Sequence, residues 1–401
     1  MTRRGTGHLD GTARNRDASA LVTSTGGDVT TRAQAMTVGQ KRRFYRDGFI
    51  VLKNVVSEKL LEAARGCIRN AKKGEYVGPR KEMIDLLTAS ALTPIIHEAM
   101  GPFDPPVNCQ VAINPVREPG DNYTPLGYRD RDVPYYAAGI HMDGNITIAS
   151  PQDVQRGSPA EIYARHFAAG PEGDIGRSAE VRGHNFGVLF QDPEMTLSLG
   201  SFTAFAFVAL NDQTVEGSGQ TAVIPGAHHL MEKFFQRQYA INGHLGPEGP
   251  DWPRLNHDTP NRCGMHYLPP EVFEAFVDET SETTPDGRRW PRPTQVLMEA
   301  GDACITMYHI PHSATRNENG TESRKNIIFR IRHKKRQPHI VPDNAGLTDH
   351  PDRAFDGGWL TFEEGNDPWE RSKQSMIDMW KEWDGMREIV AEQKALETAA
   401  G

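Results

Sequence analysis

From Val107 onward the chain consists of short apolar segments separated by loops rich in Gly, Pro, Asp and Asn. Short strands joined by such turns are typical of an antiparallel β-barrel or double sheet, so this texture constrains the fold more than any other feature. Strands are predicted at 107–116, 138–149, 185–189, 202–211, 220–224, 294–298, 303–307 and 326–332. Two long polar stretches, near 150–183 and 231–293, interrupt the series, and insertions of this length tend to be lids or binding loops.

Helices are predicted before the strand region. Thr37 and Gln40 have the spacing of a capping box, which indicates a helix start. A strand over 48–56 follows, Ser57 is expected to cap a second helix, and a third helix is predicted across 83–100.

The C-terminal region has a different pattern. A helix predicted over 368–397 carries an apolar stripe of Met and Trp, which would suit packing on the core or a homodimer contact. We therefore expect an α+β fold, mainly β, with a double-stranded β-helix core of the jelly-roll or cupin-like kind. A disordered tail (1–35) would precede the main domain (36–345), and an extension (346–401) would follow it.

Composition excludes several classes of function. A net charge of −8 and a pI near 6.0 argue against nucleic acid as a partner. The four cysteines show no CxxC spacing, which argues against a disulfide framework or a structural zinc site. No apolar run approaches the ~20 residues of a membrane span, and no secretory signal is present. We expect a cytoplasmic protein; an organellar address in the Arg- and Ser/Thr-containing N-terminus is the weaker alternative.

His141-Met142-Asp143 is the first candidate metal motif. Residues two apart on a strand point to the same face, so this imidazole and this carboxylate can converge on one ion. Alone, such a triplet is more often a polar pair on a loop.

A second histidine follows the Gly301-Asp302 pair and the apolar strand predicted at 303–307. His309 and His312 both compete for this role, and since they lie three residues apart on an extended chain, we expect only one of them to be a ligand. Two histidines and one carboxylate occupy one face of an iron ion and leave its other positions open to O₂.

Arg324 begins the next predicted strand, and Arg316 and Arg330 are its alternatives. A guanidinium can hold a carboxylate through two parallel hydrogen bonds, as the far end of a dicarboxylic cosubstrate requires. Asn108 and Gln110, on the strand before the His141 segment, could also contact such a cosubstrate or could be ordinary polar residues of a barrel.

In series, these segments resemble the phytanoyl-CoA dioxygenase family of Fe(II)/2-oxoglutarate oxygenases. The resemblance rests on 44–52, 139–144, 209–212, 219–228 and 301–325, in that order, and covers roughly 37–332. The family spacing from the Gly-Asp pair selects His312 over His309, and Arg324 over Arg316 and Arg330. The interval between Asp143 and His312 is longer than is usual in the family.

The resemblance implies an enzyme that needs Fe(II), 2-oxoglutarate and O₂. It would oxidise, most simply hydroxylate, a C–H bond of a small molecule and release succinate and CO₂. The expected site residues are the metal ligands His141, Asp143 and His312 and the cosubstrate contacts Arg324, Gln110 and Asn108. In halogenating relatives the acid at this position is replaced, which leaves room for a halide on the metal. Because Asp143 is present here as the third protein ligand, hydroxylation is favoured over halogenation. The alternative is a metal-binding cupin-like isomerase or binding protein, neither of which calls for the Arg324 clamp.

Overall fold

The computed structural model describes residues 35–103, 105–118, 140, 142, 148–151, 195–198, 203–241, 245, 250–252, 268–283, 289–334 and 374–400. By its internal contacts the chain divides into Met1–Arg32 and Ala33–Gly401, and all described residues belong to the second unit. Four predictions fall largely or wholly outside the described residues: the tail over 1–35, the strand over 138–149, most of the insertion near 150–183 and the strand over 185–189. The predicted ligands His141 and Asp143 also lie outside them.

The described strands pair antiparallel in two main sheets. The five-stranded sheet has the order β1 (Phe49–Leu52), β10 (Ala303–Met307), β5 (Ala204–Ala209), β12 (Arg324–Ile331), β2 (Gln110–Asn114). The three-stranded sheet has the order β11 (His312–Ala314), β6 (Thr221–Val223), β9 (Thr294–Gln295). Two small two-stranded antiparallel sheets pair β3 (Ile148–Pro151) with β4 (Met195–Ser198) and β7 (Glu282–Thr283) with β8 (Arg289–Trp290).

Several predicted strands are confirmed, and the structure also contains strands that were not predicted. The strand over 303–307 is confirmed as β10, and those over 107–116, 202–211 and 220–224 correspond to the shorter β2, β5 and β6. The short strands β4, β7, β8 and β11 were not predicted. Helices contribute more of the described residues than strands do, so this part of the chain is a mixture of helix and antiparallel sheet rather than mainly β. Among the described helices, none has the length and apolar character needed to cross a membrane.

The first helix begins where the capping box predicts. In α1 (Val38–Asp47) the Thr37 hydroxyl accepts from the Gln40 amide, and the Gln40 side chain accepts from the Thr37 amide. Gly48 ends the helix with φ 79°, a conformation that costs glycine little. Ser57 does occupy the N-cap position of α2 (Glu58–Arg69), but its side chain makes no capping hydrogen bond.

The single helix predicted over 83–100 is wrong. The chain forms α3 (Lys81–Thr88) and α4 (Leu92–Met100) instead. The Ser90 hydroxyl donates to the Leu87 carbonyl and accepts from the Leu92 amide, so it satisfies the backbone at the break. Pro94 fits the first turn of α4, whereas inside one continuous helix its ring would clash with the preceding turn.

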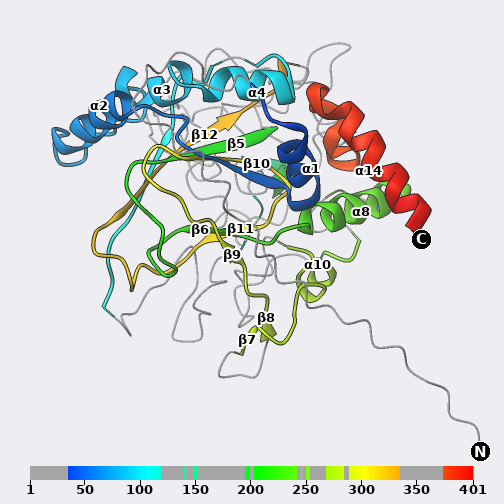
Figure 1. The fold of residues 1–401 in the computed structure, drawn as a ribbon. Coiled ribbons are helices and arrows are strands. Elements are labelled where there is room, and N and C mark those ends of the chain that lie inside the picture. The colour runs from blue at the N-terminus through cyan, green and yellow to red at the C-terminus, as the bar shows by residue number, and fades with distance from the viewer. Residues whose placement is uncertain are drawn as a thin grey trace, which may run out of the picture. The chain divides into compact units, whose positions relative to one another are not determined.

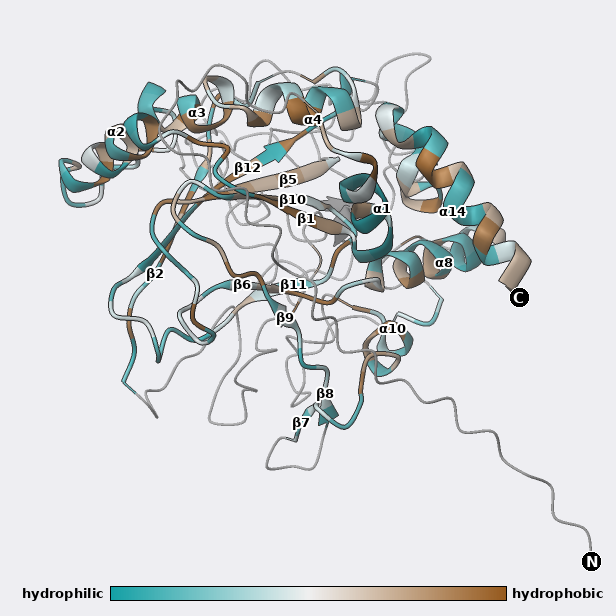
Figure 2. Cartoon of the chain, in the orientation of Figure 1, coloured by the Kyte–Doolittle hydropathy of each residue, from teal (hydrophilic) through white to brown (hydrophobic). Residues whose placement is uncertain are grey.

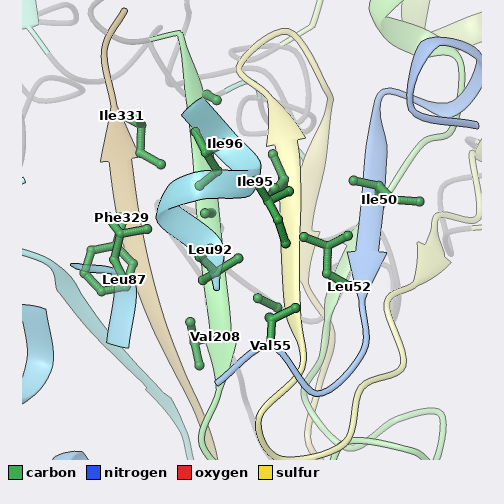
Figure 3. Packing of buried hydrophobic residues seen from close by; sticks show 14 of the residues in the cluster. Ile50, Leu52, Val55, Leu87, Leu92, Ile95, Ile96, Val208, Phe329 and Ile331 are labelled. Atoms are coloured by element: carbon green, nitrogen blue, oxygen red, sulfur yellow. The ribbon is translucent and has the colours of Figure 1, made fainter. Parts of the chain in front are cut away.

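Helices α2–α4 cover one face of the five-stranded sheet, and the three-stranded sheet lies on its other side (Figure 1). Figure 3 shows helix side chains on the sheet residues that point toward them. We call this group the outer cluster; it includes Leu87, Leu92, Ile95, Ile96, Val208, Ile305, Ile327, Phe329 and Ile331. Truncation of Phe329, which is fully buried, would cost about 3–5 kcal/mol.

The opposite face of the sheet forms a second group of buried side chains. We call it the inner cluster; it includes Ile140, Met142, Phe205, Phe207, Ala209, Val223, Cys304, Tyr308 and Ile310. Because strand side chains alternate, Phe205 and Phe207 face inward while Ala206 and Val208 face outward. Strands β1 and β10 also consist mainly of apolar residues, brown in Figure 2, whose side chains divide between the outer and inner clusters.

The start of the second predicted insertion is a helix and not a polar loop. In α8 (Ala227–Ala240) Met231, Phe234 and Phe235 are buried in the inner cluster. The short helix α10 (Pro270–Glu274) packs beside α8, where Arg237 pairs with Glu271.

The continuous helix predicted over 368–397 is also wrong. The described residues form two 3₁₀ turns, η3 (Met379–Glu382) and η4 (Asp384–Met386), before α14 (Arg387–Ala400). A Cβ at Gly385 would overlap the Glu98 carbonyl of α4, so the chain must approach that helix more closely than a regular turn allows. The Met/Trp stripe is buried within the same chain, where Trp383 and Trp380 contact Phe44 and Tyr45 of α1.

Candidate functional site

His312 begins β11 and lies between the two sheets. It pairs in register with Val223 of β6 and is 8% exposed. Its ring centroid lies 4.8 Å from that of Phe205, an inward-facing residue of β5. The imidazole is thus placed against the inner face of the five-stranded sheet.

The backbone also orients this imidazole. His312 Nδ1 lies 3.0 Å from the Ile310 carbonyl oxygen, which can only accept a hydrogen bond. Nδ1 must therefore carry the proton, and in the neutral ring the lone pair is on Nε2. Histidine ligands of metals are commonly oriented by such a bond, so the donor chemistry of His312 fits a metal ligand.

His309 lies in a different environment. It is fully buried, and its ring lies 5.9 Å from Phe235 of α8. β10 ends at Met307 and a turn separates it from β11, so the two histidines do not belong to one regular strand. His312 contacts Phe205 on the inner face of β5, and His309 contacts Phe235 of α8.

His141 itself lies outside the described residues, but the residues on either side of it are described. Ile140 and Met142 are both fully buried in the inner cluster. That cluster also contains Phe205, the residue that His312 contacts. Ile140 and Met142 therefore belong to the same buried group of side chains as Phe205, which contacts the His312 ring.

Arg324 begins β12 and is 5% exposed. Ile327, Phe329 and Ile331 of this strand belong to the outer cluster, so Arg324, Asn326, Ile328 and Arg330 face inward. Its Nε donates to the Gly219 carbonyl at 2.6 Å, and its Nη1 donates to the Ala112 carbonyl at 3.2 Å. Arg324 is therefore a buried cation between the sheets, a position that suits an anionic ligand group.

The alternative arginines differ from Arg324. Arg316 lies in the β11–β12 connection, with its Nε 2.7 Å from Glu318 Oε1, so an ion pair already engages it. Arg330 faces inward at the level of Phe205, and its Nη1 donates to Gln110 Oε1 at 3.2 Å. Arg330 is less buried than Arg324.

The two predicted amide contacts lie apart. Gln110 begins β2 opposite Ile328, on the inward face, and accepts from Arg330. Asn108 precedes the strand; its Oδ1 accepts from the Cys109 amide, and it packs against Gly78. Their assignment to a cosubstrate stays a prediction.

Sequence reasoning missed a group of buried amides beside Arg324. Gln213 Nε2 donates to Asn326 Oδ1 at 2.6 Å, and both side chains are at most 1% exposed. Asn114 and Asn317 form further hydrogen bonds at the start of β12. Because strand side chains alternate, a prediction that Arg324 faces inward implies the same of Asn326. A prediction that Gln110 faces inward likewise implies the same of Asn114.

Other buried histidine and cysteine side chains near the sheets have structural roles. His228 Nε2 lies 2.8 Å from the Tyr45 carbonyl and donates to it, while burial lowers the pKa of this imidazole well below its usual value. Burial raises the pKa of the Cys304 thiol, which keeps it protonated and a poor metal ligand. Within the part of the chain that the structure describes, no three His, Cys, Asp or Glu side chains form a metal-binding group.

No family model and no curated protein matches the sequence. A search of solved structures finds HygX from Streptomyces hygroscopicus with nickel and 2-oxoglutarate bound. It is 13% identical in sequence, the match covers 82% of this chain and 97% of HygX, and the TM-score is 0.38. SnoK, a non-heme alpha-ketoglutarate-dependent carbocyclase from nogalamycin biosynthesis, has 12% identity over 83% of this chain and 95% of its own, with TM-score 0.38. The nickel complex of the non-heme monooxygenase ThoJ has 12% identity over 88% and 99%, with TM-score 0.34. These identities and scores are low, so the function proposed below rests on the chain's own residues.

Proposed function

We propose that the chain is an Fe(II)- and 2-oxoglutarate-dependent dioxygenase with a double-stranded β-helix core. One observation carries the proposal. The space between two facing antiparallel sheets holds both a buried, backbone-oriented imidazole, His312, and a buried guanidinium, Arg324. The first suits a metal and the second suits the far carboxylate of a dicarboxylic cosubstrate.

The protein's part in this reaction is to bind and orient. His312 would present Nε2 to the iron, and we assign the remaining protein ligands to His141 and Asp143. Arg324 would hold the distal carboxylate of 2-oxoglutarate, with Gln110 and Asn108 as further candidate contacts. When bound, iron and 2-oxoglutarate together would supply the oxidant that O₂ alone does not provide.

The apolar surroundings serve the same chemistry. Phe205 lies on the inward face of β5, is 1% exposed and contacts the His312 ring, so it excludes water from the side of the imidazole that it covers. A dry surrounding strengthens the pairing of Arg324 with a carboxylate. With Asp143 retained as a ligand, we expect hydroxylation of a small-molecule C–H bond.

The second candidate is a cupin-like isomerase or a metal-binding protein without oxygenase activity. Either would use a histidine on a strand between two sheets, as His312 is. Neither needs a buried arginine at the start of the strand after that histidine, and Arg324 therefore favours the dioxygenase.

Succinate formation separates the two candidates. Purified protein is supplied with Fe(II), ascorbate, O₂ and 2-oxoglutarate, and succinate is quantified by mass spectrometry. The proposal predicts Fe(II)-dependent succinate that is lost in His312→Ala and retained in His309→Ala. Metal binding without any succinate, across a panel of candidate small molecules, would support the second candidate.

A further inference from the structure

Asn114 ends β2 directly opposite Arg324, the first residue of β12. Both side chains are buried, at 6% and 5% exposure. Residues in register across two strands point to the same side, so both enter the space between the sheets.

The two side chains share one hydrogen-bond acceptor. Arg324 Nε donates to the Gly219 carbonyl at 2.6 Å, and Asn114 Nδ2 donates to the same oxygen at 3.3 Å. A carbonyl oxygen has two lone pairs and can accept both. Together with the Ala112 carbonyl, which accepts from Arg324 Nη1 at 3.2 Å, this oxygen restrains the rotation of the guanidinium.

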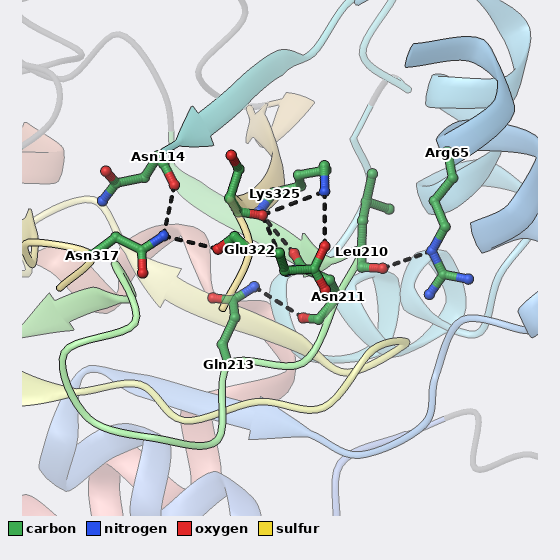
Figure 4. Close-up of polar contacts among 9 residues, drawn as sticks. Arg65, Asn114, Leu210, Asn211, Gln213, Asn317, Glu322 and Lys325 are labelled. Carbon is green, nitrogen blue, oxygen red and sulfur yellow. Dashed lines mark hydrogen bonds and ion pairs between the residues drawn. The ribbon is translucent and has the colours of Figure 1, made fainter. Parts of the chain in front are cut away.

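Asn114 also connects the two sheets. Its Nδ2 donates to the Thr315 carbonyl at 2.8 Å, just beyond β11, while Gly219 lies just before β6. Its own carbonyl accepts from Asn317 Nδ2 at 3.0 Å, and Asn317 also bonds the Glu322 carbonyl, as the dashed lines in Figure 4 show. Asn114 thus links the backbone just after β11 to the backbone just before β6, where the Gly219 carbonyl lies.

The backbone at position 219 is specialised for this contact. Gly219 has φ 77°, and a Cβ there would lie 2.7 Å from Asn114 Nδ2 and 2.9 Å from Asn317 Cβ. A larger residue would push both amides away, so the carbonyl and its two donors can meet only at glycine.

We infer that Asn114 is a positioning residue for the Arg324 guanidinium, acting through the Gly219 carbonyl. The inference rests on the proposed function, since it assigns Arg324 to the carboxylate of 2-oxoglutarate. Without Asn114 the Gly219 carbonyl is no longer tied to the Thr315 backbone, so this oxygen can shift and draw Arg324 Nε out of the geometry that a two-point grip on a carboxylate requires.

The test is calorimetric titration of 2-oxoglutarate into full-length protein loaded with Mn(II) in oxygen-free buffer, where no turnover occurs. Asn114→Ala should weaken binding about tenfold, the effect of one well-placed hydrogen bond. In turnover assays the same change should appear in KM for 2-oxoglutarate with little change in kcat. In an Arg324→Ala background, Asn114→Ala should have no further effect on 2-oxoglutarate binding.

Asn211→Ala is the matched control. Asn211 is 9% exposed and also makes two hydrogen bonds next to the start of β12, to the Ser323 carbonyl and from the Lys325 amide. It does not touch Gly219, so its loss should reduce thermal stability about as much as Asn114→Ala while leaving 2-oxoglutarate affinity unchanged. Equal losses of affinity in both variants would mean that Asn114 has only a structural role.

Asn114→Asp decides the question if the alanine variant does not fold. It keeps the side chain's shape but cannot donate to Gly219, and its carboxylate would compete for Arg324. Affinity for 2-oxoglutarate should therefore fall further than tenfold, and unchanged affinity would overturn the inference.

A different result would overturn the proposed function. If Arg324→Ala binds 2-oxoglutarate as tightly as the parent, the Arg324 assignment falls, and with it the inference. If Arg324→Ala weakens binding and Asn114→Ala does not, only the inference is overturned.

Discussion

The ring of His312 lies 4.8 Å, centroid to centroid, from the ring of Phe205. Phe205 belongs to the inner cluster together with Ile140 and Met142, the residues on either side of His141. The described neighbours of His141 and the aromatic neighbour of His312 therefore belong to one buried cluster.

The first prediction concerns the choice between the two histidines. His312→Ala should fail to retain stoichiometric Fe(II) after reconstitution and dialysis, because one of three protein ligands is missing. His309→Ala should retain iron but melt several degrees lower, since a fully buried ring is lost from beside Phe235. Iron content is measured by mass spectrometry and melting by circular dichroism. The reverse pattern would reassign the ligand to His309.

A second prediction concerns the arginines. Arg324→Ala should raise KM for 2-oxoglutarate about 10- to 100-fold, the effect of losing hydrogen bonds to a charged group, with iron content nearly unchanged. The KM of Arg324→Lys should lie between those of the parent and Arg324→Ala, since lysine keeps the charge but lacks the planar guanidinium. Arg330→Ala is the matched inward-facing control; if it has the larger effect, Arg330 is the clamp.

The Gly-Asp pair is predicted to be structural. Asp302 is 1% exposed and accepts from the Asn54 amide at 2.8 Å, from the Glu299 amide at 2.7 Å and from Lys53 Nζ at 2.6 Å. Asp302→Ala leaves these donors without their acceptor and should lower the free energy of unfolding by about 2–4 kcal/mol, with unchanged affinity for 2-oxoglutarate. Denaturant unfolding measures this effect. Asp212→Ala is the control: Asp212 is exposed and accepts from the Ala300 amide, so its loss should cost less.

Glu232 should make stability depend on pH. It is 7% exposed on α8, its carboxylate accepts from the Met379 amide at 2.7 Å, and burial raises the pKa of this carboxyl. The folded protein therefore binds a proton more tightly than the unfolded chain, and stability should fall as pH rises from about 4.5 through the raised folded pKa.

Glu232→Gln keeps an acceptor for Met379 and removes the charge. It should flatten the fall in melting temperature across this pH range and raise the melting temperature at neutral pH. Glu274→Gln, an exposed change on α10, should leave the profile as it is. A parent profile as flat as that of Glu232→Gln would contradict this account.

Local signals predicted the start of the fold well. The Thr37–Gln40 capping box is set by residues three apart, and the hydrophobic run of β10 needs no distant partner to be recognised. The helix breaks between α3 and α4 and before α14 were not predicted. They depend on contacts that cannot be inferred from the spacing of apolar residues along the chain. Ser90 replaces backbone bonds at the α3–α4 junction, and Gly385 must approach the carbonyl of Glu98.

The candidate site shows the same division. The resemblance to the dioxygenase family selected His312 and Arg324, and both are buried between the sheets. Asn114 and Gly219 were not predicted, because their importance comes from one shared carbonyl oxygen, and only the pairing of β2 with β12 brings them to Arg324.

The most direct test is equilibrium dialysis of radiolabelled 2-oxoglutarate under oxygen-free conditions. Four samples are compared: the parent protein with Fe(II), the parent without metal, His312→Ala with Fe(II), and Arg324→Ala with Fe(II). The account predicts one tightly bound 2-oxoglutarate per chain in the first sample and much weaker binding in each of the others, because the ligand is held at both ends. Binding to the metal-loaded parent that is no tighter than in the other three samples would contradict the assignment of a single iron and 2-oxoglutarate site to His312 and Arg324.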